Sequence, residues 1–270
     1  SLQETFYRQI PMNNGMVRVG MNLHDILKEA ERFDVIGISS LFTAQTRMVE
    51  ETVSALVRAY PEKLIILGGV NARSQLGRFF DAGAHIICTS EAEATIIEIA
   101  DILREGNNDF SKVRGIAFKQ NGQIRMTPPA LTLNNLDDLA IPAWDMLPLQ
   151  RYWDIARPHG SVFSQDNPYR YASAMTSRGC PFKCTFCHIS WEKEQRDIFG
   201  AIGTLRFKTP ERVLQEMLIL KELGVEYVLL EDDSLLGKKA RAIQIFTLMR
   251  DLHLRLGDVN GINLAHMFAM

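Results

Sequence analysis

Cysteine is scarce in this chain, and its scarcity excludes one common class of protein. The 270 residues include four cysteines, and three of them fall within eight positions, at Cys180, Cys184 and Cys187. Small secreted scaffolds spread more cysteines over shorter chains and pair them in disulfides. The count and the clustering favour a reducing compartment and a bound metal instead.

A strong charge of one sign and a long apolar run are lacking too. The 30 basic and 32 acidic residues leave a formal net charge of −2, which gives no electrostatic basis for gripping a nucleic acid. No apolar stretch approaches the roughly 20 residues of a membrane-spanning helix, and the first residues lack the apolar core of a signal peptide. We therefore expect a cytoplasmic protein with no nucleic-acid partner and no membrane span.

Short apolar runs alternate with helical patterns in the first half of the chain. The runs 34–39, 64–67 and 85–88 have the length and composition of buried strands. The helix after the third run is expected to bury four apolar residues, Ile96, Ile97, Ala100 and Leu103. This alternation predicts a doubly wound, Rossmann-like parallel sheet, and the pair Asn121-Gly122 predicts a hairpin at its edge.

Proline marks a change of composition in the middle of the chain. Six of the ten prolines lie between residues 128 and 168, in a segment with little periodicity that also contains Trp144 and Trp153. Flexible linkers avoid tryptophan, so we expect a packed connector. The predicted organisation is a domain at 1–127, a connector at 128–170 and a second domain at 171–270.

The strand–helix alternation resumes after the connector. Strands are expected at 171–177, 226–230 and 262–270, helices from Pro210 to Gly224 and at about 238–254, and a polar loop at 191–208. The first of these helices is expected to bury one apolar stripe, Val213, Leu214, Met217 and Leu218. The pattern predicts a partial (β/α) barrel. We expect strands to be missing before the first domain and after the second.

The spacing of the clustered cysteines is C-x3-C-x2-C. Three thiolates on one loop can hold three corners of a cubane or of a tetrahedral metal site, and they leave one position open. A structural zinc site usually begins with C-x2-C and has a second pair downstream, but no later cysteine follows Cys187. His188 would be an awkward fourth ligand because it directly follows a cysteine. Structural zinc stays open as the alternative interpretation.

The stretch RGCPFKCTFC, which follows a predicted strand, resembles the radical S-adenosylmethionine (SAM) superfamily. The superfamily motif is C-x3-C-x-Φ-C with an aromatic residue at Φ, where this chain has Phe186. The resemblance implies a [4Fe–4S] cluster on Cys180, Cys184 and Cys187, with SAM bound to the fourth iron and the backbone of Phe186 beside its adenine. It also implies reduction by a low-potential donor such as flavodoxin or ferredoxin, followed by a 5′-deoxyadenosyl radical that abstracts hydrogen from the substrate.

Acidic residues follow the next predicted strand, as Glu231, Asp232 and Asp233. Active sites of α/β barrels collect at the carboxyl ends of strands. The resemblance implies that these acids face the amino group of SAM. The alternative interpretation is that they cap the helix that follows.

Small residues follow two strands of the first domain, where doubly wound sheets bind ligands. These positions resemble the cobalamin-binding domain of cobalamin-dependent methyltransferases, which has a Ser-x-Leu turn and a Gly-Gly pair beside the cofactor's nucleotide tail. The residues that the resemblance assigns to cobalamin are Ser39, Ser40, Leu41, Thr43, Gly68, Gly69 and Glu91. The glycines have an alternative interpretation, because many such turns need only their backbone freedom. The family's Asp-x-His-x-x-Gly loop is expected upstream of Ser1.

The order of the domains resembles the cobalamin-dependent radical SAM family. The resemblance implies a methyltransferase that uses methylcobalamin on an unactivated carbon of a small molecule or peptide. The alternative with the same cofactors is radical cyclisation or rearrangement without net methylation. A different class is a non-catalytic metal-binding protein.

Overall fold

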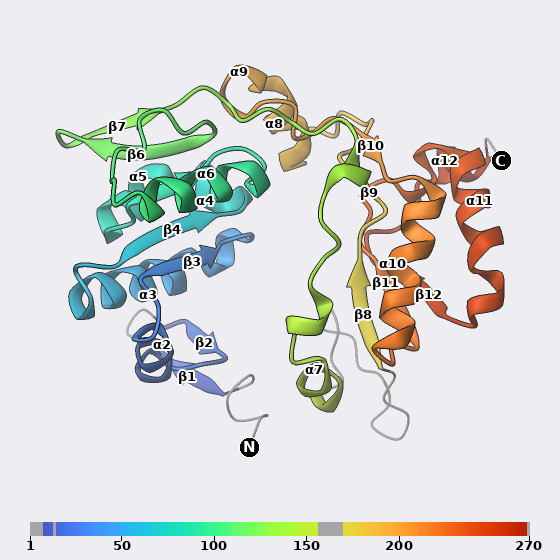
Figure 1. Cartoon of the computed structure of the whole chain (residues 1–270), viewed down its shortest axis with the longest axis horizontal. Helices are drawn as coiled ribbons and strands as arrows, with labels where there is room; N and C mark the ends of the chain where they lie inside the picture. Colours follow the sequence, from blue (N-terminus) through green and yellow to red (C-terminus); the bar gives the residue numbers. More distant parts are fainter. Residues whose placement is uncertain (1–7, 13–14, 156–169, 269–270) are drawn as a thin grey trace. The chain divides into compact units, whose positions relative to one another are not determined.

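The computed structural model describes residues 8–12, 15–155 and 170–268, and these form two compact units (Figure 1). The first unit comprises the chain up to Thr132 together with Glu192–Ala201, and the second comprises Leu133–Trp191 together with the chain from Ile202. The end of the predicted connector and the last two residues of the predicted final strand lie outside the described residues. None of the helices in the described part of the chain is long and apolar enough to cross a membrane.

The first unit is built on a five-stranded sheet. Its order is β3-β4-β5-β6-β7; β3, β4 and β5 are parallel, and β6 and β7 are antiparallel. The strands are β3 Val35–Ser39, β4 Leu64–Gly68, β5 Ile86–Cys88, β6 Ile116–Gln120 and β7 Gln123–Met126. The hairpin predicted at Asn121-Gly122 is confirmed as the β6–β7 turn, and both of its residues have positive φ.

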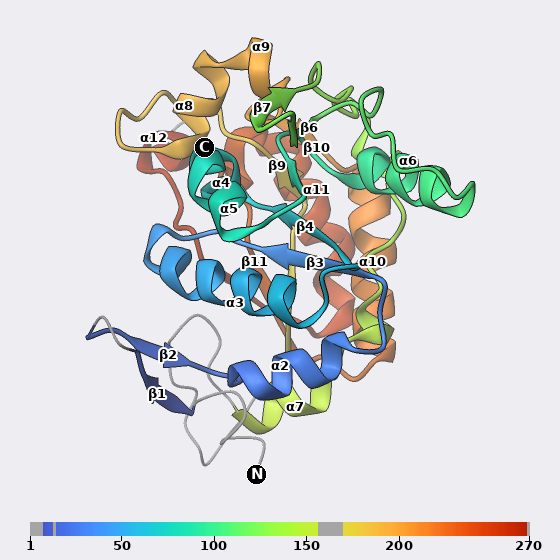
Figure 2. The same cartoon turned by 90° about the vertical axis from the view of Figure 1, so that its left-hand side faces the viewer.

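Helices cover both faces of this sheet, as the doubly wound prediction requires. One core joins α3 and α5 to the sheet around Leu56, Ile65 and Phe79, and another joins α6 to the opposite face around Ile66 and Ile99. The helices are α2 Leu23–Ala30, α3 Thr46–Ala59, α4 Val70–Ser74, α5 Leu76–Ala82 and α6 Glu93–Arg104. A two-stranded ribbon, β1 Gln9–Pro11 and β2 Val17–Val19, precedes them on the α3 side (Figure 2).

One predicted helix face in this unit is wrong. On α6, Ile96 and Ile97 are exposed, and the helix instead buries Thr95 and Ile99. Thr95 is held there because its hydroxyl donates to the backbone oxygen of Arg114 at 3.0 Å. A tertiary hydrogen bond thus helps to decide which face of α6 is buried, and the pattern of apolar residues alone did not indicate that face.

The second unit contains a three-stranded parallel sheet. Its order is β12-β11-β8, and the ribbon β9–β10 continues from its edge. The strands are β8 Tyr171–Ala174, β9 Ser177–Arg178, β10 Arg206–Phe207, β11 Tyr227–Leu230 and β12 Arg255–Asp258. The helices are α7 Leu149–Ile155, α8 His188–Glu194, α9 Arg196–Phe199, α10 Pro210–Glu222, α11 Lys239–Met249 and α12 Leu264–Phe268, of which α9 and the end of α8 belong to the first unit.

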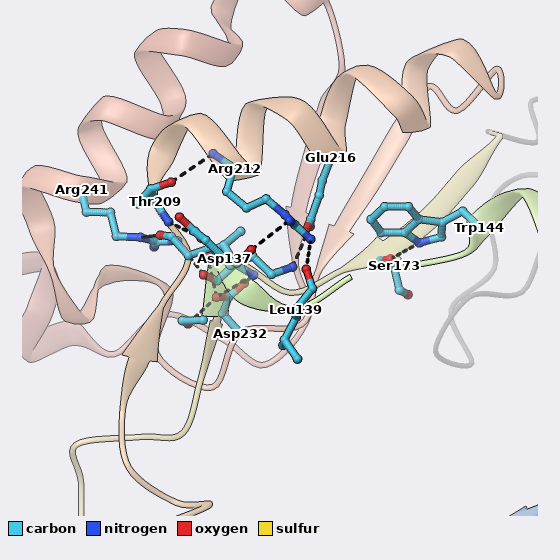
Figure 3. Close-up of polar contacts among 12 residues, drawn as sticks. Asp137, Leu139, Trp144, Ser173, Thr209, Arg212, Glu216, Asp232 and Arg241 are labelled. Carbon is cyan, nitrogen blue, oxygen red and sulfur yellow. Dashed lines mark hydrogen bonds and ion pairs between the residues drawn. The ribbon is translucent and has the colours of Figure 1, made fainter. Parts of the chain in front are cut away.

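The segment 133–153 belongs to the second unit and packs against its helix α10 and strand β8. The backbone oxygens of Asp137 and Leu139 accept bonds from Arg212, whose guanidinium also pairs with the buried Glu216 at 2.8 Å (Figure 3). The indole N–H groups of two tryptophans donate to β8, from Trp144 to the Ser173 oxygen at 3.3 Å and from Trp153 to the Tyr171 oxygen at 2.7 Å. Both indoles belong to the core of this unit.

Three predictions for the second half of the chain are wrong. The expected loop 191–208 contains the end of α8, all of α9 and strand β10. The expected strand 262–270 is helical at α12, and the third strand is β12 instead, held in register with β11. On α10, Leu218 is exposed while Glu216 is buried, because Lys208 and Arg212 neutralise that carboxylate.

Candidate functional site

The cysteine loop begins immediately after the ribbon strand β9. Gly179 has φ +81°, and a Cβ at this position would collide with the backbone oxygen of Thr204. The backbone N–H of Cys180 donates to the Gly203 oxygen at 3.4 Å. Only glycine therefore fits directly before the first cysteine, and the approach to the loop is held by the chain at 203–204.

The centre of the loop is open, and its end is anchored in a helix. Cys184 is exposed and the Phe186 side chain is 91% exposed. The backbone N–H of Cys187 donates to the Cys184 oxygen at 3.1 Å, and α8 starts at the next residue. The ring of Phe182 lies 5.0 Å from that of His266 on α12. The loop is thus supported at both ends and offers its middle cysteine to the outside.

The three thiols suit a multi-iron cluster better than a single ion. None of the four cysteines forms a disulfide. Among the described residues, no three histidine, cysteine or acidic side chains converge as ligands of one metal ion. In a cubane each cysteine binds a different iron atom, so the three thiols surround the cluster without sharing one metal ion. The donor set is three free thiols with no fourth cysteine in the loop, which matches a [4Fe–4S] cluster with one open iron and lacks the fourth ligand of a closed structural zinc site.

The three acidic residues after β11 lie in different environments. Asp232 has none of its surface exposed, and its carboxylate accepts bonds from Thr176 and Ser177 (Figure 3). Glu231 is half-buried and Asp233 is exposed. The structure thus places all three at the carboxyl end of the second strand, but it turns only two of them toward solvent.

Buried polar atoms without a hydrogen-bond partner gather near these acids. Within the described residues they include the hydroxyl oxygen of Ser234, Nη1 of Arg241 and both carboxylate oxygens of Asp258. Burial raises the pKa of Asp258, the backbone amides of Gly261 and Asn260 lower it in part, and the charge of Asp232 raises it further. These amides lie near the carboxylate without meeting the geometry of a hydrogen bond. Polar atoms of this kind usually have partners, so this end of the sheet has the character of a ligand site. Sequence analysis missed Arg241 and Asp258.

Two strand ends meet at the predicted cobalamin site of the first unit. Ser39 at the end of β3 is in register with Gly68 at the end of β4. Gly69 follows with φ +101°, and a Cβ there would collide with the backbone oxygen of Ser40. That oxygen also accepts bonds from the backbone N–H groups of Asn71 and Ala72.

A buried amide links the same two strand ends. The Asn71 side chain donates to the hydroxyl of Ser40 at 2.8 Å and to that of Thr46 at 3.0 Å. Leu41 and Phe42, and the shorter Ser39 and Thr43, remain exposed around this buried network. The edge therefore combines a rigid floor with an open rim. Sequence analysis missed Asn71, although an asparagine two residues after a Gly-Gly pair is a signal that could be searched for.

The third strand of this edge places Glu91 half-buried, shortly after β5. Beside it, Thr89 is fully buried and its hydroxyl has no hydrogen-bond partner in the described chain. Burial raises the pKa of Cys88 to about 11, although Arg73 lowers it in part. Cys88 therefore stays a neutral thiol at neutral pH and is unsuited to binding iron. The unpartnered Thr89 hydroxyl and the open strand ends fit a cofactor at this edge.

The segment after the cysteine loop is attached to the first unit. Glu192 on α8 pairs with Nε of Arg73 on α4 at 2.7 Å, and both side chains are largely buried. The Ser90 hydroxyl donates to the Phe199 oxygen at 3.1 Å. These contacts join a segment that starts five residues after Cys187 to elements that follow β4 and β5.

A shallow groove of about 1170 Å³ lies at the opposite end of the first unit's sheet. Its lining includes Asp34, Leu64 and His85, which stand at the amino ends of β3, β4 and β5. Burial lowers the pKa of His85, whose Nδ1 accepts from the Ile65 amide at 3.0 Å. None of the predicted site residues lines this groove.

Comparison with known proteins identifies the class. Residues 175–259, which span the cysteine loop and the acids after β11, match the family model of the radical SAM superfamily. An uncharacterized methyltransferase of Pyrococcus horikoshii is 30% identical over 231 residues, which are 83% of this chain and 45% of that protein. The chain belongs to the radical SAM superfamily.

Other relatives extend over both units. The cytidylyl-2-hydroxyethylphosphonate methyltransferase of Streptomyces wedmorensis is 25% identical over 98% of this chain and 52% of its own length. The anaerobic magnesium-protoporphyrin IX monomethyl ester cyclase of Cereibacter sphaeroides is 26% identical over 74% of this chain and 30% of its own length. The chain thus spans about half the length, or less, of these curated relatives.

Solved structures confirm the predicted fold class. OxsB, a cobalamin-dependent SAM radical enzyme solved with aqua-cobalamin and SAM bound, matches 88% of this chain with a TM-score of 0.67 and 19% identity, over 32% of its own chain. The radical SAM methyltransferase TsrM of Kitasatospora setae matches 87% with a TM-score of 0.62 and 16% identity, over 45% of its chain. A Rossmann-type unit followed by a partial radical SAM barrel therefore describes this chain.

Proposed function

We propose that this chain is part of a cobalamin-dependent radical SAM enzyme that methylates an unactivated carbon. The observation that carries the proposal is the cysteine loop, which has both ends supported, its centre open, and acidic residues at the neighbouring strand end. Three thiolates and one open position are what a SAM-binding cluster needs. The match of residues 175–259 to the superfamily supports this assignment.

Each residue of the loop has a distinct role in the proposal. Cys180, Cys184 and Cys187 hold the [4Fe–4S] cluster, and the exposed Phe186 places its backbone beside the adenine of SAM. Glu231 and Asp233 face the ammonium group of SAM with their negative charges. When bound, the cluster supplies the electron that cleaves SAM to a 5′-deoxyadenosyl radical, and methylcobalamin supplies the methyl group. The electron comes from a low-potential donor such as flavodoxin or ferredoxin.

The carboxyl edge of the first unit binds cobalamin in this proposal. Ser40 belongs to the rigid floor described above, Gly69 packs against its backbone oxygen, and Ser39, Leu41 and Thr43 belong to the exposed rim. The half-buried Gly68 and Glu91 complete the proposed site. Support comes from the strand-end register and from the two solved relatives, both of which have been solved with cobalamin bound. The exposed rim leaves these residues accessible to a flat cofactor.

Methyl transfer is favoured over cyclisation by two relatives that match more of this chain than the cyclase does. The two that cover 83% and 98% of this chain are methyltransferases, whereas the cyclase covers 74%. Cyclisation without net methylation is the second candidate. The substrate is a small molecule or peptide whose mass decides between them, because methylation adds one methylene.

Anaerobic reconstitution with iron, sulfide and hydroxocobalamin tests the proposal. We expect the parent chain to take up iron and corrinoid and, with SAM and dithionite, to release 5′-deoxyadenosine. Cys184→Ala should abolish SAM cleavage, whereas Cys88→Ala is the matched control because that thiol is buried and neutral. Zinc in place of iron, or equal SAM cleavage by Cys184→Ala, would refute the radical assignment. Failure to retain corrinoid would refute the role of the first unit.

A further inference from the structure

Thr176, four residues before the first cysteine, has all of its polar groups bonded inside the protein. Its backbone N–H donates to both oxygens of the Asp232 carboxylate at 3.1 Å, and its hydroxyl donates to Oδ1 at 2.8 Å. Its backbone oxygen accepts from Nη2 of Arg241 at 2.6 Å and from the Lys208 amide at 3.0 Å. Thr176 is 1% exposed, so the site is a buried junction.

Asp232 ties a second residue into the same junction. The Ser177 hydroxyl also donates to its Oδ1, and Ser177 is the first residue of β9. Arg241 reaches the junction from α11, and its Nε donates to the Lys208 oxygen at 2.6 Å. The end of β11, helix α11 and the residue after β10 thus all contribute to the junction around Thr176 and Ser177. These two residues lie shortly before Cys180 in the chain.

The geometry leaves Asp232 little capacity for SAM. None of its surface is exposed, and three different donors already occupy its carboxylate, mostly through Oδ1. Removal of the Asp232 carboxylate would leave the buried N–H of Thr176 and the hydroxyls of Thr176 and Ser177 without this acceptor. Leaving buried donors unpaired costs more stability than losing a hydrogen bond at the surface. Asp233, the next residue, is exposed instead.

We infer that Asp232 is a positioning residue, which orients the cysteine loop through Thr176 and Ser177 and is not itself a SAM ligand. The inference deepens the proposed function and rests on it for the identity of the cluster. Supporting groups around metal ligands commonly change metal affinity by roughly 10- to 100-fold when they are removed. Asp232 acts one step further away, because it bonds to the chain three and four residues before Cys180 and not to the cysteine itself. The SAM-facing role passes to Glu231 and Asp233.

Two matched pairs of variants test the inference. Asp232→Asn keeps the acceptor Oδ1, but it removes the negative charge and puts an amide N–H where Oδ2 accepts from the Thr176 N–H. It is compared with Asp233→Asn, and Thr176→Val is compared with Thr176→Ser, which keeps the hydroxyl. After anaerobic reconstitution we measure iron per chain against a competing chelator, the electron paramagnetic resonance spectrum of the reduced cluster, and SAM affinity by equilibrium dialysis. Hydrogen exchange across 176–180 is measured in the cluster-free chain, so that it reports on the junction even if no cluster forms.

The expected results separate positioning from ligation. Asp232→Asn and Thr176→Val should weaken iron retention by roughly tenfold, alter the cluster spectrum and speed hydrogen exchange at 176–180, while Thr176→Ser matches the parent. Asp233→Asn should keep iron and exchange unchanged and weaken SAM binding by about tenfold. If Asp232→Asn does not fold, the Thr176 pair decides by the same readouts.

Two outcomes would overturn the inference. One is Asp232→Asn with parental iron, spectrum and exchange but weakened SAM binding. The other is Thr176→Val that matches the parent in all three. A parent chain that takes up no iron would instead refute the proposed function, and the exchange data would still judge the junction.

Discussion

Gly69 offers the sharpest test of why the first unit carries a Gly-Gly pair. The two glycines are adjacent, but their surroundings differ. Gly69 has φ +101° and ψ 162°, and a Cβ would collide with the Ser40 oxygen while lying 2.9 Å from the Ser40 carbonyl carbon. Gly68 ends β4 with ordinary backbone angles, and a Cβ there meets nothing within 4 Å.

The expected cost of Gly69→Ala follows from these two facts. A residue other than glycine in this region of φ and ψ costs about 1–3 kcal/mol, and the forced shift of backbone atoms adds about 1–3 kcal/mol. We therefore expect a loss of about 2–6 kcal/mol in the free energy of unfolding of the first unit. Gly68→Ala should change it by less than about 1 kcal/mol, because alanine also reduces the entropy of the unfolded chain.

The protein contains an internal spectroscopic control for this measurement. Trp144 and Trp153 lie in the core of the second unit, whereas Trp191 lies on α8, whose end belongs to the first unit. In a Trp191→Phe background the fluorescence therefore follows the second unit while far-ultraviolet circular dichroism follows both. In a urea titration Gly69→Ala should shift a dichroism transition and leave the fluorescence transition in place. Gly68→Ala should shift neither transition. It should weaken corrinoid retention, because Gly68 belongs to the proposed cobalamin site. Equal stability of the two variants would refute the reasoning.

Three further predictions concern single contacts. Burial lowers the pKa of His85 in the folded protein, so the unfolded chain binds more protons as the pH falls through about 6.5. The urea midpoint of the parent should therefore decrease from pH 7.5 to pH 5.5. A His85→Gln variant whose midpoint changes with pH as much as that of the parent would contradict this. Glu192→Gln should lower the free energy of unfolding by about 3 kcal/mol, because it leaves the charge of Arg73 without its carboxylate partner. The double variant with Arg73→Gln should recover part of this stability in a thermal melt. Fully additive losses in the two single variants would contradict the coupling. Trp153→Phe should cost about 1–2 kcal/mol through its lost bond to Tyr171, seen as a lower dichroism melting temperature, and an unchanged temperature would show that the bond contributes nothing.

Local signals were sufficient for much of the fold. The apolar runs before Ser40 and Gly69 are strands because short, fully buried runs between turn residues have few other options. Thr209 followed by Pro210 correctly predicted the start of α10, and the Thr209 hydroxyl accepts from the Arg212 amide. These features depend on residues within a few positions of one another.

The failures arise where distant residues decide the structure. The segment 191–208 is polar, and its helices are stabilised by Arg73, which lies 119 positions from Glu192. The strand β12 depends on its register with β11 rather than on its own composition. In the site, the cysteine spacing could be interpreted from sequence, but the burial of Asp232 could not, because Thr176 lies 56 positions away.

The two indole bonds to β8 have a practical consequence for dividing this protein into fragments. Arg170 and Ala174 direct their oxygens to β11, so the alternation of the strand turns the oxygens of Tyr171 and Ser173 to the open edge, where Trp153 and Trp144 occupy them. An uncovered strand edge recruits strands from other chains. A fragment that begins at residue 171 would lose both tryptophans and leave the edge of β8 unpaired and prone to aggregation. A fragment meant to give the radical SAM segment in soluble form should therefore begin before Trp144.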